Sequence, residues 1–366
     1  MGNAHGIGII GLGVISRAYL STLAGVQDAR IVAVADLDAG RASAVAAEIG
    51  ALALTPEELV AHPGVGTVLN LTIPAAHAEI ALAAIAAGKD VFGEKPLAVT
   101  LDEAHAVMGA AEAAGTRVGS APDTVLGAGI QTARAAIDSG LIGRPVAASA
   151  TWVAAGHERW HPQPDFYYRR GGGPLFDMGP YYVTSLVQLL GPVVSVMGAS
   201  SRAQSERVIS SGPRAGERIP VDVDTHVSGI LQHASGALST ITMSFDAVRS
   251  TAAPIEVHGQ TGSLALPDPN MFDGQTRLWR SEEGEPEVLD DSAGYVDAGR
   301  GVGLLEFIRS APGESRASGA VGLHVLEIMH AILDSARVGE RRTIASTIER
   351  PALVPLTPAE EWRRHG

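Results

Sequence analysis

The sequence predicts an α/β domain with a doubly wound parallel sheet, followed by an α+β domain with a large, mostly antiparallel open sheet. The chain of 366 residues exceeds the size at which one hydrophobic core stops growing. Short apolar runs alternate with Ala-rich helical patterns over residues 6–120. This rhythm changes after about Asp123, so we predict two domains, at residues 1–123 and 124–366.

The first domain is predicted to contain strands and helices in turn. Its apolar runs are nearly continuous, as strands buried on both faces of a parallel sheet require. The predicted strands are 7–11, 31–36, 67–73, 90–94 and 117–121, and the predicted helices are 14–24, 41–50, 76–88 and 101–115.

The second domain is predicted to be richer in antiparallel strands. A helix over 125–140 precedes a strand over 146–154, an aromatic-rich passage and a helix that ends at Leu190. In the segment LSTITMSF the apolar residues alternate with Thr and Ser, the period of a strand with one buried face. The segment LQHASGALS turns through Ser235 and Gly236 and predicts a hairpin.

Composition excludes several functions. The formal charge of −13 argues against broad affinity for nucleic acid or for an anionic membrane surface. The chain has no Cys, which excludes a disulfide, a thiolate nucleophile and a zinc-thiolate site. The N-terminal stretch reads as a strand and not as a signal peptide, and no segment is apolar enough to span a bilayer. We expect a cytoplasmic protein without a metal site.

The motif GLGVIS predicts a dinucleotide site. Gly11 and Gly13 follow the first strand, where glycine permits a tight turn and close approach to a pyrophosphate, and Ser16 replaces the usual third glycine. Asp36 ends the second strand, 25 residues after Gly11, where a carboxylate accepts hydrogen bonds from ribose hydroxyls. The alternative is a plain glycine turn with a helix-capping Asp. The predicted cofactor contacts in this Rossmann domain are Gly11, Gly13, Val14, Ile15 and Asp36.

Two lysines stand out among 27 basic residues. Only Lys89 and Lys95 are Lys, and both lie in the segment GKDVFGEKP. Arg does not deprotonate in a protein, whereas a buried Lys can act as an acid or a base. Lys95 follows a predicted strand at the carboxyl end of the sheet, where ligands of open α/β folds bind. We predict that Lys95 lies at the cofactor.

The glycine motif together with TIPAAHAEIALAAIAAGKDVFGEKPL resembles the Gfo/Idh/MocA family of nicotinamide-dependent oxidoreductases. The resemblance continues through THVSGILQ, EVHGQTGSLALPDPNMFDG and LHVLEIMHAILDSARVGE. It implies that Lys95 lies near the nicotinamide and the reacting hydroxyl. It also implies that Thr72, Pro74, His77 and Glu94 lie at the cofactor; a His77 that merely packs at the start of a helix is nearly as good an interpretation.

The third motif is RRGGGPLFDMGPYYVTSL. Eight aromatic residues fall between Trp152 and Tyr182, a density that suits a sugar-binding wall, although core packing would also explain Phe166 and Phe176. Asp177 and Tyr181 lie four residues apart and share one face of a predicted helix. The alternative for Asp177 is a simple N-cap, with Pro180 in the first helical turn.

The family pattern places His where this chain has Tyr181, and Asp where it has Thr184. Tyr at the His position resembles the subgroup of glucose-fructose oxidoreductase and dihydrodiol dehydrogenase, in which this Tyr is taken as the proton donor or acceptor. The resemblance implies Lys95, Tyr181 and Asp177 as catalytic residues. The predicted substrate contacts are Lys95, Trp160, His161, Asp177 and Tyr181.

Residues 157–161 spell HERWH, a literal match to the zinc-protease pattern. Pro162 biases His161 away from helical geometry, and the preceding segment reads as a strand, so we do not predict zinc. Trp160 and His161 are instead expected on a loop beside the substrate. His226 and His324 are core or pocket residues, between which the sequence does not decide.

The resemblance implies hydride transfer between a nicotinamide cofactor and a sugar, polyol or related cyclic carbinol. One alternative is an NAD-dependent enzyme that cleaves or epimerises a sugar through transient oxidation, and another is a non-catalytic sugar or NAD sensor. No basic or hydroxyl residue directly follows Asp36, so we expect NAD(H) over NADP(H); Arg41, one helical turn away, is the residue that could favour NADP(H). We also expect a homodimer or homotetramer.

Overall fold

The computed structural model describes residues 4–363 and divides the chain into two compact units. The first unit runs to Gly127 and also includes Gly294–Leu323 and the segment from Val354 onward; the second comprises Ala128–Ala293 and His324–Leu353. These units differ from the two continuous ranges 1–123 and 124–366, because two later segments return to the first unit. Arg309 and Asp28 illustrate this return, since the guanidinium Nε donates to the carboxylate at 2.8 Å.

A parallel six-stranded sheet forms the centre of the first unit, in the order β3-β2-β1-β4-β5-β6. This order reverses direction between β1 and β4, which is where doubly wound sheets bind ligands. The prediction of a parallel sheet is confirmed. The strands are β1 (His5–Ile10), β2 (Ala29–Ala35), β3 (Leu52–Ala53), β4 (Thr67–Asn70), β5 (Asp90–Gly93) and β6 (Val118–Ser120).

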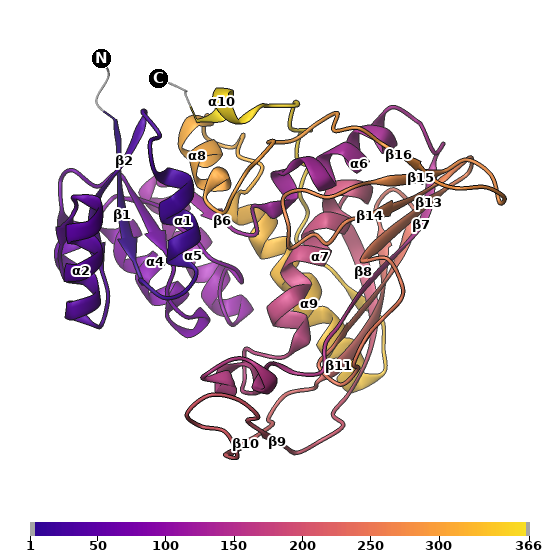
Figure 1. Ribbon diagram of the computed structural model, residues 1–366, viewed down its shortest axis with the longest axis horizontal. Helices are drawn as coiled ribbons and strands as arrows, with labels where there is room; N and C mark the ends of the chain where they lie inside the picture. Colours follow the sequence, from indigo (N-terminus) through magenta and orange to yellow (C-terminus); the bar gives the residue numbers. More distant parts are fainter. Residues whose placement is uncertain (1–3, 364–366) are drawn as a thin grey trace. The chain divides into compact units, whose positions relative to one another are not determined.

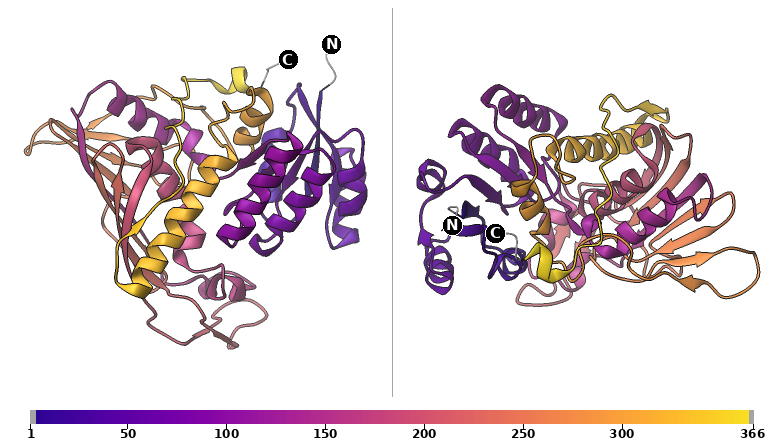
Figure 2. Two further views of the ribbon diagram at one scale, coloured as in Figure 1. Left: turned by 180° about the vertical axis from the view of Figure 1, so that it is seen from behind. Right: turned by 90° about the horizontal axis from the view of Figure 1, so that it is seen from above.

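Helices cover both faces of this sheet (Figures 1 and 2). Their ends carry the expected signals: Thr55 and Thr100 form capping boxes, and Gly50 and Gly115 end helices in the left-handed conformation. The helices of the first unit are α1 (Ser16–Leu23), α2 (Ala39–Ile49), α3 (Pro56–Ala61), η1 (Pro74–Ala76), α4 (His77–Ala86), α5 (Leu101–Ala114), η2 (Thr124–Leu126), α8 (Val302–Arg309) and α10 (Ala359–Trp362).

A nine-stranded sheet dominates the second unit, in the order β16-β15-β14-β13-β7-β12-β11-β8-β17. Only β12 and β7 pair in parallel among the described neighbours, so the prediction of a mostly antiparallel sheet is confirmed. Its strands are β7 (Pro145–Val153), β8 (Val193–Ser201), β11 (His226–His233), β12 (Leu238–Ser244), β13 (Ile255–Gly259), β14 (Ser263–Leu266), β15 (Arg277–Trp279), β16 (Glu287–Val288) and β17 (Arg342–Thr343).

The predicted hairpin joins β11 and β12, with Gly236 at a φ of 86°. Ile241 and Met243 are buried, as the alternation predicts. Helices α7 (Pro174–Leu190) and α9 (Gly319–Val338) lie on one face of this sheet (Figures 1 and 2), and α6 (Ala128–Asp138) packs beside α7 and β14. A Cβ at Gly198 of β8 would lie 2.2 Å from the Ile332 carbonyl oxygen, so glycine lets α9 approach the strand closely.

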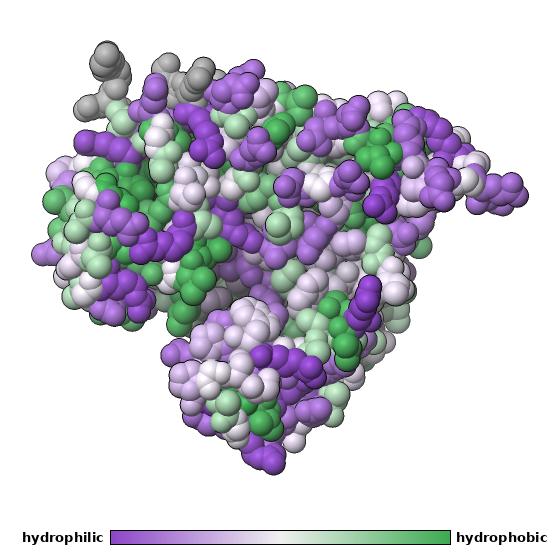
Figure 3. All heavy atoms as spheres, viewed as in Figure 1, coloured by the Kyte–Doolittle hydropathy of each residue, from purple (hydrophilic) through white to green (hydrophobic). Residues whose placement is uncertain are grey.

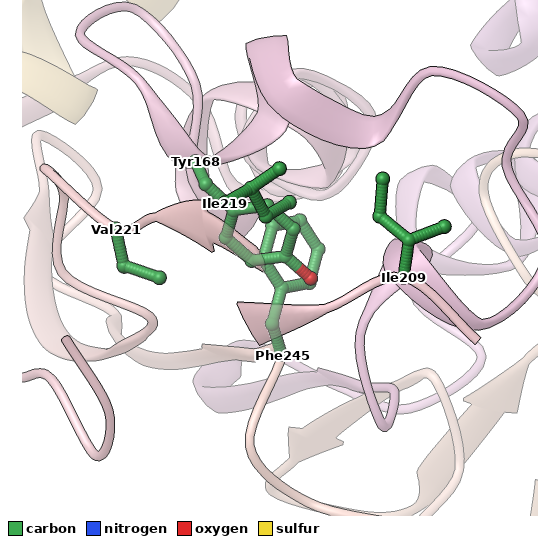
Figure 4. Packing of buried hydrophobic residues seen from close by; sticks show 5 residues of the cluster. All are labelled: Tyr168, Ile209, Ile219, Val221 and Phe245. Atoms are coloured by element: carbon green, nitrogen blue, oxygen red, sulfur yellow. The ribbon is translucent and has the colours of Figure 1, made fainter. Parts of the chain in front are cut away.

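A small lobe of the second unit has its own hydrophobic cluster (Figure 4). It combines the 3-10 helices η3 (His157–Arg159) and η4 (Pro164–Tyr168) with the two-stranded sheet of β9 (Glu206–Val208) and β10 (Arg218–Pro220). The cluster anchors the aromatic passage, and its buried members are Tyr168, Ile209, Ile219, Val221 and Phe245.

No helix among residues 4–363 is both long and apolar enough to cross a membrane. Figure 3 shows hydrophilic and hydrophobic residues interspersed over the face that it draws.

Candidate active site

The glycine loop after β1 meets the loop after β4 at the point where the strand order reverses. Gly11 has a φ of +96°, and a Cβ there would lie 2.7 Å from the Leu71 carbonyl carbon and oxygen. Only glycine fits this conformation and this space. Gly13 has open space around its Cα, and Val14 is exposed, so the turn leaves room for a ligand. Ile15 is half-buried at the start of α1.

Helix α1 begins at Ser16, two residues later than predicted. The reason is the turn before it: the Ser16 hydroxyl and backbone N–H both donate to the Gly13 carbonyl, at 2.7 and 3.1 Å. Ser16 is buried and closes the glycine turn, a role in addition to the small size that the sequence suggested.

Asp36 ties the glycine loop to the end of β2. Its Oδ2 accepts the Leu12 N–H at 2.7 Å and its Oδ1 accepts the Asp38 N–H at 2.8 Å. The helix-capping alternative is wrong for Asp36, since Asp38 caps α2 by accepting the Arg41 N–H at 3.0 Å. The exposed Arg41 Nη1 also donates to both Asp36 oxygens, at 3.3 and 3.4 Å. A carboxylate has about four acceptor positions, so ribose hydroxyls would take the places of these two long bonds. The residues around Gly11 and Asp36 fit a bound dinucleotide.

Asn70, at the end of β4, organises the next loop. Its Oδ1 accepts the Thr72 hydroxyl at 2.6 Å, and its Nδ2 donates to the His77 carbonyl at 3.0 Å. Pro74 starts the short helix η1 that leads into α4. Sequence reasoning missed Asn70, although a polar residue that ends an apolar strand at the carboxyl edge of the sheet was an available signal.

His77 is buried, and its ring joins two loops. Nδ1 lies 2.7 Å from the Pro96 carbonyl oxygen, and Nε2 lies 3.1 Å from the Thr72 carbonyl oxygen. Burial lowers the pKa of His77, although both carbonyls act in the opposite direction. In the neutral ring a single N–H donates, and the shorter contact assigns it to Pro96. This placement favours the packing interpretation of His77; its contact with a cofactor stays a prediction.

Glu94 fixes the backbone of Lys95. The buried Glu94 carboxylate accepts the Tyr19 hydroxyl at 2.8 Å and the Lys95 backbone N–H at 3.1 Å. Burial, together with the charges of Glu94 and Asp123, raises the pKa of Tyr19 well above its ordinary value, so Tyr19 stays a donor. Glu94 on one side and His77 on the other hold the Lys95–Pro96 turn at the carboxyl end of β5.

Asp177 and Tyr181 lie on helix α7 of the second unit, four residues apart, as predicted. The N-cap alternative for Asp177 is wrong, because the helix begins at Pro174 with Gly173 as its cap. Asp177 is inside the first turn, where the helix dipole favours a negative charge. Pro180 lies within the helix and not in its first turn. Tyr181 is buried.

His157 is the partner of Asp177 that sequence reasoning missed. His157 Nε2 lies 2.7 Å from Asp177 Oδ2, and its Nδ1 accepts the Trp160 indole N–H at 3.2 Å. The sequence offered His157 only as part of HERWH, and nothing in that motif indicates a carboxylate partner 20 residues later. Folding of the aromatic passage onto α7 creates the pair.

Glu158 anchors the lobe. It accepts the Tyr168 hydroxyl in a short hydrogen bond and forms an ion pair with Arg207 at 3.3 Å. Arg207 also pairs closely with Asp246. Burial, followed by the bond to Glu158, raises the pKa of Tyr168. The zinc-protease arrangement needs an α-helix, whereas η3 has three residues and Glu158 is engaged elsewhere; residues 4–363 contain no cluster suited to a metal ion.

The predicted aromatic wall lies beside this pair. Trp160 is 61% exposed, and its ring meets His157 edge to face at 5.1 Å between centroids. The His161 ring contacts Tyr167 at 5.4 Å and Phe166 at 5.5 Å, and burial lowers the pKa of His161. Phe166 is exposed, so the core-packing alternative does not apply to it, whereas Phe176 is buried.

His226 and His324, which the sequence left as core or pocket residues, lie in different surroundings. His226 lies half-buried on the open face of the large sheet, 3.0 Å from the Ser244 hydroxyl. His324 is fully buried in α9, and its Nε2 accepts the Val193 N–H at 3.1 Å. His324 is a core residue.

The parallel sheet, the glycine turn at Gly11 and the carboxylate at Asp36 define the class: a two-domain protein with a dinucleotide site. Residues 5–121 match the oxidoreductase family with an NAD-binding Rossmann fold, and residues 130–265 match the GFO/IDH/MocA C-terminal domain. The chain belongs to the Gfo/Idh/MocA family and is an NAD-binding oxidoreductase.

Named relatives agree with this assignment. The chain is 28% identical over 348 residues to 1,5-anhydro-D-fructose reductase of Ensifer adhaerens, covering 92% of this chain and 98% of the relative. It is 28% identical to myo-inositol 2-dehydrogenase of Thermotoga maritima, over 70% of this chain and 74% of the relative. The solved levoglucosan dehydrogenase with NADH and L-sorbose superposes with a TM-score of 0.78 at 22% identity, over 93% of this chain and 99% of that one, which shows the shared fold.

Proposed function

We propose that the protein oxidises a secondary alcohol, or an aldose anomeric carbon, of a sugar or polyol with NAD⁺, and catalyses the reverse reduction. The named relatives are a sugar reductase and inositol dehydrogenases, which supports this substrate class. The observation that carries the proposal is Lys95, one of two lysines in the chain, held at the carboxyl end of β5 by Glu94 and His77.

Each proposed residue has a separate task. The bound nicotinamide supplies the hydride acceptor or donor. Lys95 and Tyr181 share transfer of the hydroxyl proton, and Asp177 orients a neighbouring hydroxyl as a hydrogen-bond acceptor. This role for Tyr181 is the one that the resemblance to the glucose-fructose oxidoreductase subgroup implies.

The alternatives make different assay predictions. We expect a panel of sugars and polyols to reduce NAD⁺, seen as absorbance of the reduced nicotinamide. An enzyme that cleaves or epimerises through transient oxidation gives product without net reduction, and a sensor binds ligand without turnover. If no sugar or polyol gave net reduction of NAD⁺ and no ketone gave the reverse reaction, the proposal would be contradicted. We place the reaction in the cytoplasm.

The cofactor preference is our first prediction: NAD⁺ binds more tightly than NADP⁺. Asp36 would meet a 2′-phosphate with like charge, and Leu37 beside it is fully exposed and offers no donor. Arg41 is already paired with Asp36, at 3.3 Å. Titration of both cofactors tests this, and comparable or tighter binding of NADP⁺ would refute it. Leu37→Arg should raise NADP⁺ affinity by about 10-fold and leave NAD⁺ affinity near that of the wild type.

We also predict a homodimer, or a dimer of dimers, formed through the open face of the large sheet. Met197 of β8 pairs with Ile230 of β11 in register, and both side chains are exposed, as is Leu238 of β12. An exposed apolar sheet face of this kind is typical of an interface. Light scattering at micromolar concentration should give at least twice the chain mass. Ile230→Asp should give a monomer, whereas Val248→Asp, an exposed position outside the strands, should not; a monomeric wild type contradicts the prediction.

A further inference from the structure

The hydrogen bonds around His157 allow only one protonation pattern of its ring. An indole N–H can only donate, so the Nδ1 of His157, which faces Trp160 Nε1 at 3.2 Å, must accept and carry no proton. Nε2 faces Asp177 Oδ2 at 2.7 Å and therefore carries the proton. The structure thus assigns a neutral imidazole that donates to the carboxylate on one side and accepts from the indole on the other.

The surroundings of His157 hold its ring in place. The side chain is 8% exposed, and its ring meets those of Tyr167 and Phe245 at 4.3 and 4.7 Å between centroids. The His157 backbone N–H donates to the Tyr168 hydroxyl at 3.1 Å, and Tyr168 in turn donates to Glu158. The ring orientation is therefore fixed by the buried lobe and not by Asp177 alone.

The two hydrogen-bond partners of the His157 ring, Asp177 and Trp160, both belong to the proposed substrate site. Asp177 lies on α7, and Trp160 is 61% exposed. An Asp held by a donor at one oxygen presents an acceptor and not a proton, and an indole held by its N–H presents a ring face in one orientation. These two features suit the hydroxyl groups and the apolar face of a sugar or polyol ring.

We propose that His157 is a positioning residue of the substrate site: it fixes Asp177 as an acceptor for a substrate hydroxyl and fixes the Trp160 ring beside it. This inference rests on the proposed function, because it takes Asp177 and Trp160 as substrate contacts. His157 itself acts through these two residues and takes no part in proton transfer.

A matched pair of amide variants tests the proposal. The amide nitrogen of Gln reaches the position of the imidazole Nε2, whereas that of Asn reaches only the position of Nδ1. His157→Gln therefore keeps a donor for Asp177, and His157→Asn loses it, while both remove the ring from the aromatic cluster. We expect His157→Asn to raise the KM for the polyol on the order of 10-fold, the effect of losing a hydrogen bond to a charged group, and His157→Gln to stay within a few-fold of the wild type.

Two further measurements separate positioning from packing. The dissociation constant for NAD⁺ should be unchanged in both variants, and thermal unfolding should show that both stay folded at the assay temperature. Equal KM values for the two variants, whether raised or not, would overturn the proposal. Gln keeps the donor to the charged Asp177 and Asn does not, whereas Asn can at most replace the weaker acceptor for the Trp160 N–H.

The protonation pattern can be tested without any turnover. In ¹⁵N-histidine-labelled wild-type protein near neutral pH, the signals that disappear in His157→Gln should show a protonated Nε2 and an unprotonated Nδ1. A protonated Nδ1 would overturn the inference. If no sugar or polyol is oxidised or formed, the proposed function fails, while this spectrum still decides the state of His157.

Discussion

Replacement of Lys95 with Arg should remove most of kcat while the protein stays folded and binds NAD⁺. Arg keeps the positive charge and similar length, but a guanidinium does not deprotonate in a protein and so cannot pass a proton to or from the substrate hydroxyl. The loss should be on the order of 10²- to 10⁴-fold, the range of a general acid-base contribution. Steady-state kinetics with a saturating polyol measures kcat, and a fluorescence titration measures NAD⁺ affinity.

The chain provides its own control for this substitution. Lys89, the other lysine, donates from Nζ to the His62 carbonyl at 3.1 Å, and nothing assigns it to the reaction. Lys89→Arg should leave kcat near that of the wild type. A Lys95→Arg variant with near wild-type kcat would remove Lys95 from the chemistry and, with it, the central assignment of the proposed function.

The sheets of both units could be predicted from the sequence because each has a local signal. Buried parallel strands appear as continuous apolar runs, and the half-buried strand β12 (Leu238–Ser244) appears as strict alternation. The division into compact units had no such signal. Gly294–Leu323 returns to the first unit through contacts such as those of Asp123, which accepts the Gly301 and Gly303 N–H groups at 2.7 and 3.0 Å. Contacts over such separations leave no periodicity in the sequence.

The candidate site likewise contains some residues whose positions could be predicted from the sequence and others whose positions could not. The positions of Gly11, Asp36 and Lys95 just after strands could be predicted from the apolar runs before them, while their contacts with a cofactor stay predictions. The side chains that form hydrogen bonds with the site residues could not be predicted. Glu94 accepts hydrogen bonds from Tyr19 and from the Lys95 backbone, while its contact with the cofactor stays a prediction. His157 reaches Asp177 only after a Gly-rich and Pro-rich passage has folded. Loop conformation decides these partners, and residue types in a loop do not determine its conformation.

Replacement of Tyr181 with Phe should lower kcat on the order of 10²-fold or more if its hydroxyl is the direct acid or base. Tyr181 is buried in α7, and the substitution removes one oxygen while keeping the ring, so the helix should stay folded. If Tyr181 only orients the sugar, the loss should appear chiefly in KM. Tyr182→Phe is the matched control: the neighbouring Tyr182 hydroxyl reaches Asp268 at 3.5 Å, and kcat should change little.

The double variant tests whether Lys95 and Tyr181 serve one proton route. Residues that act as a unit are strongly non-additive, so Lys95→Arg combined with Tyr181→Phe should have a kcat close to that of the worse single variant. Independent contributions would instead multiply, and kcat would fall by the product of the two single effects. A multiplicative loss would separate the two residues into different steps, and an unchanged kcat in Tyr181→Phe alone would leave Lys95 as the proton-transfer group without Tyr181.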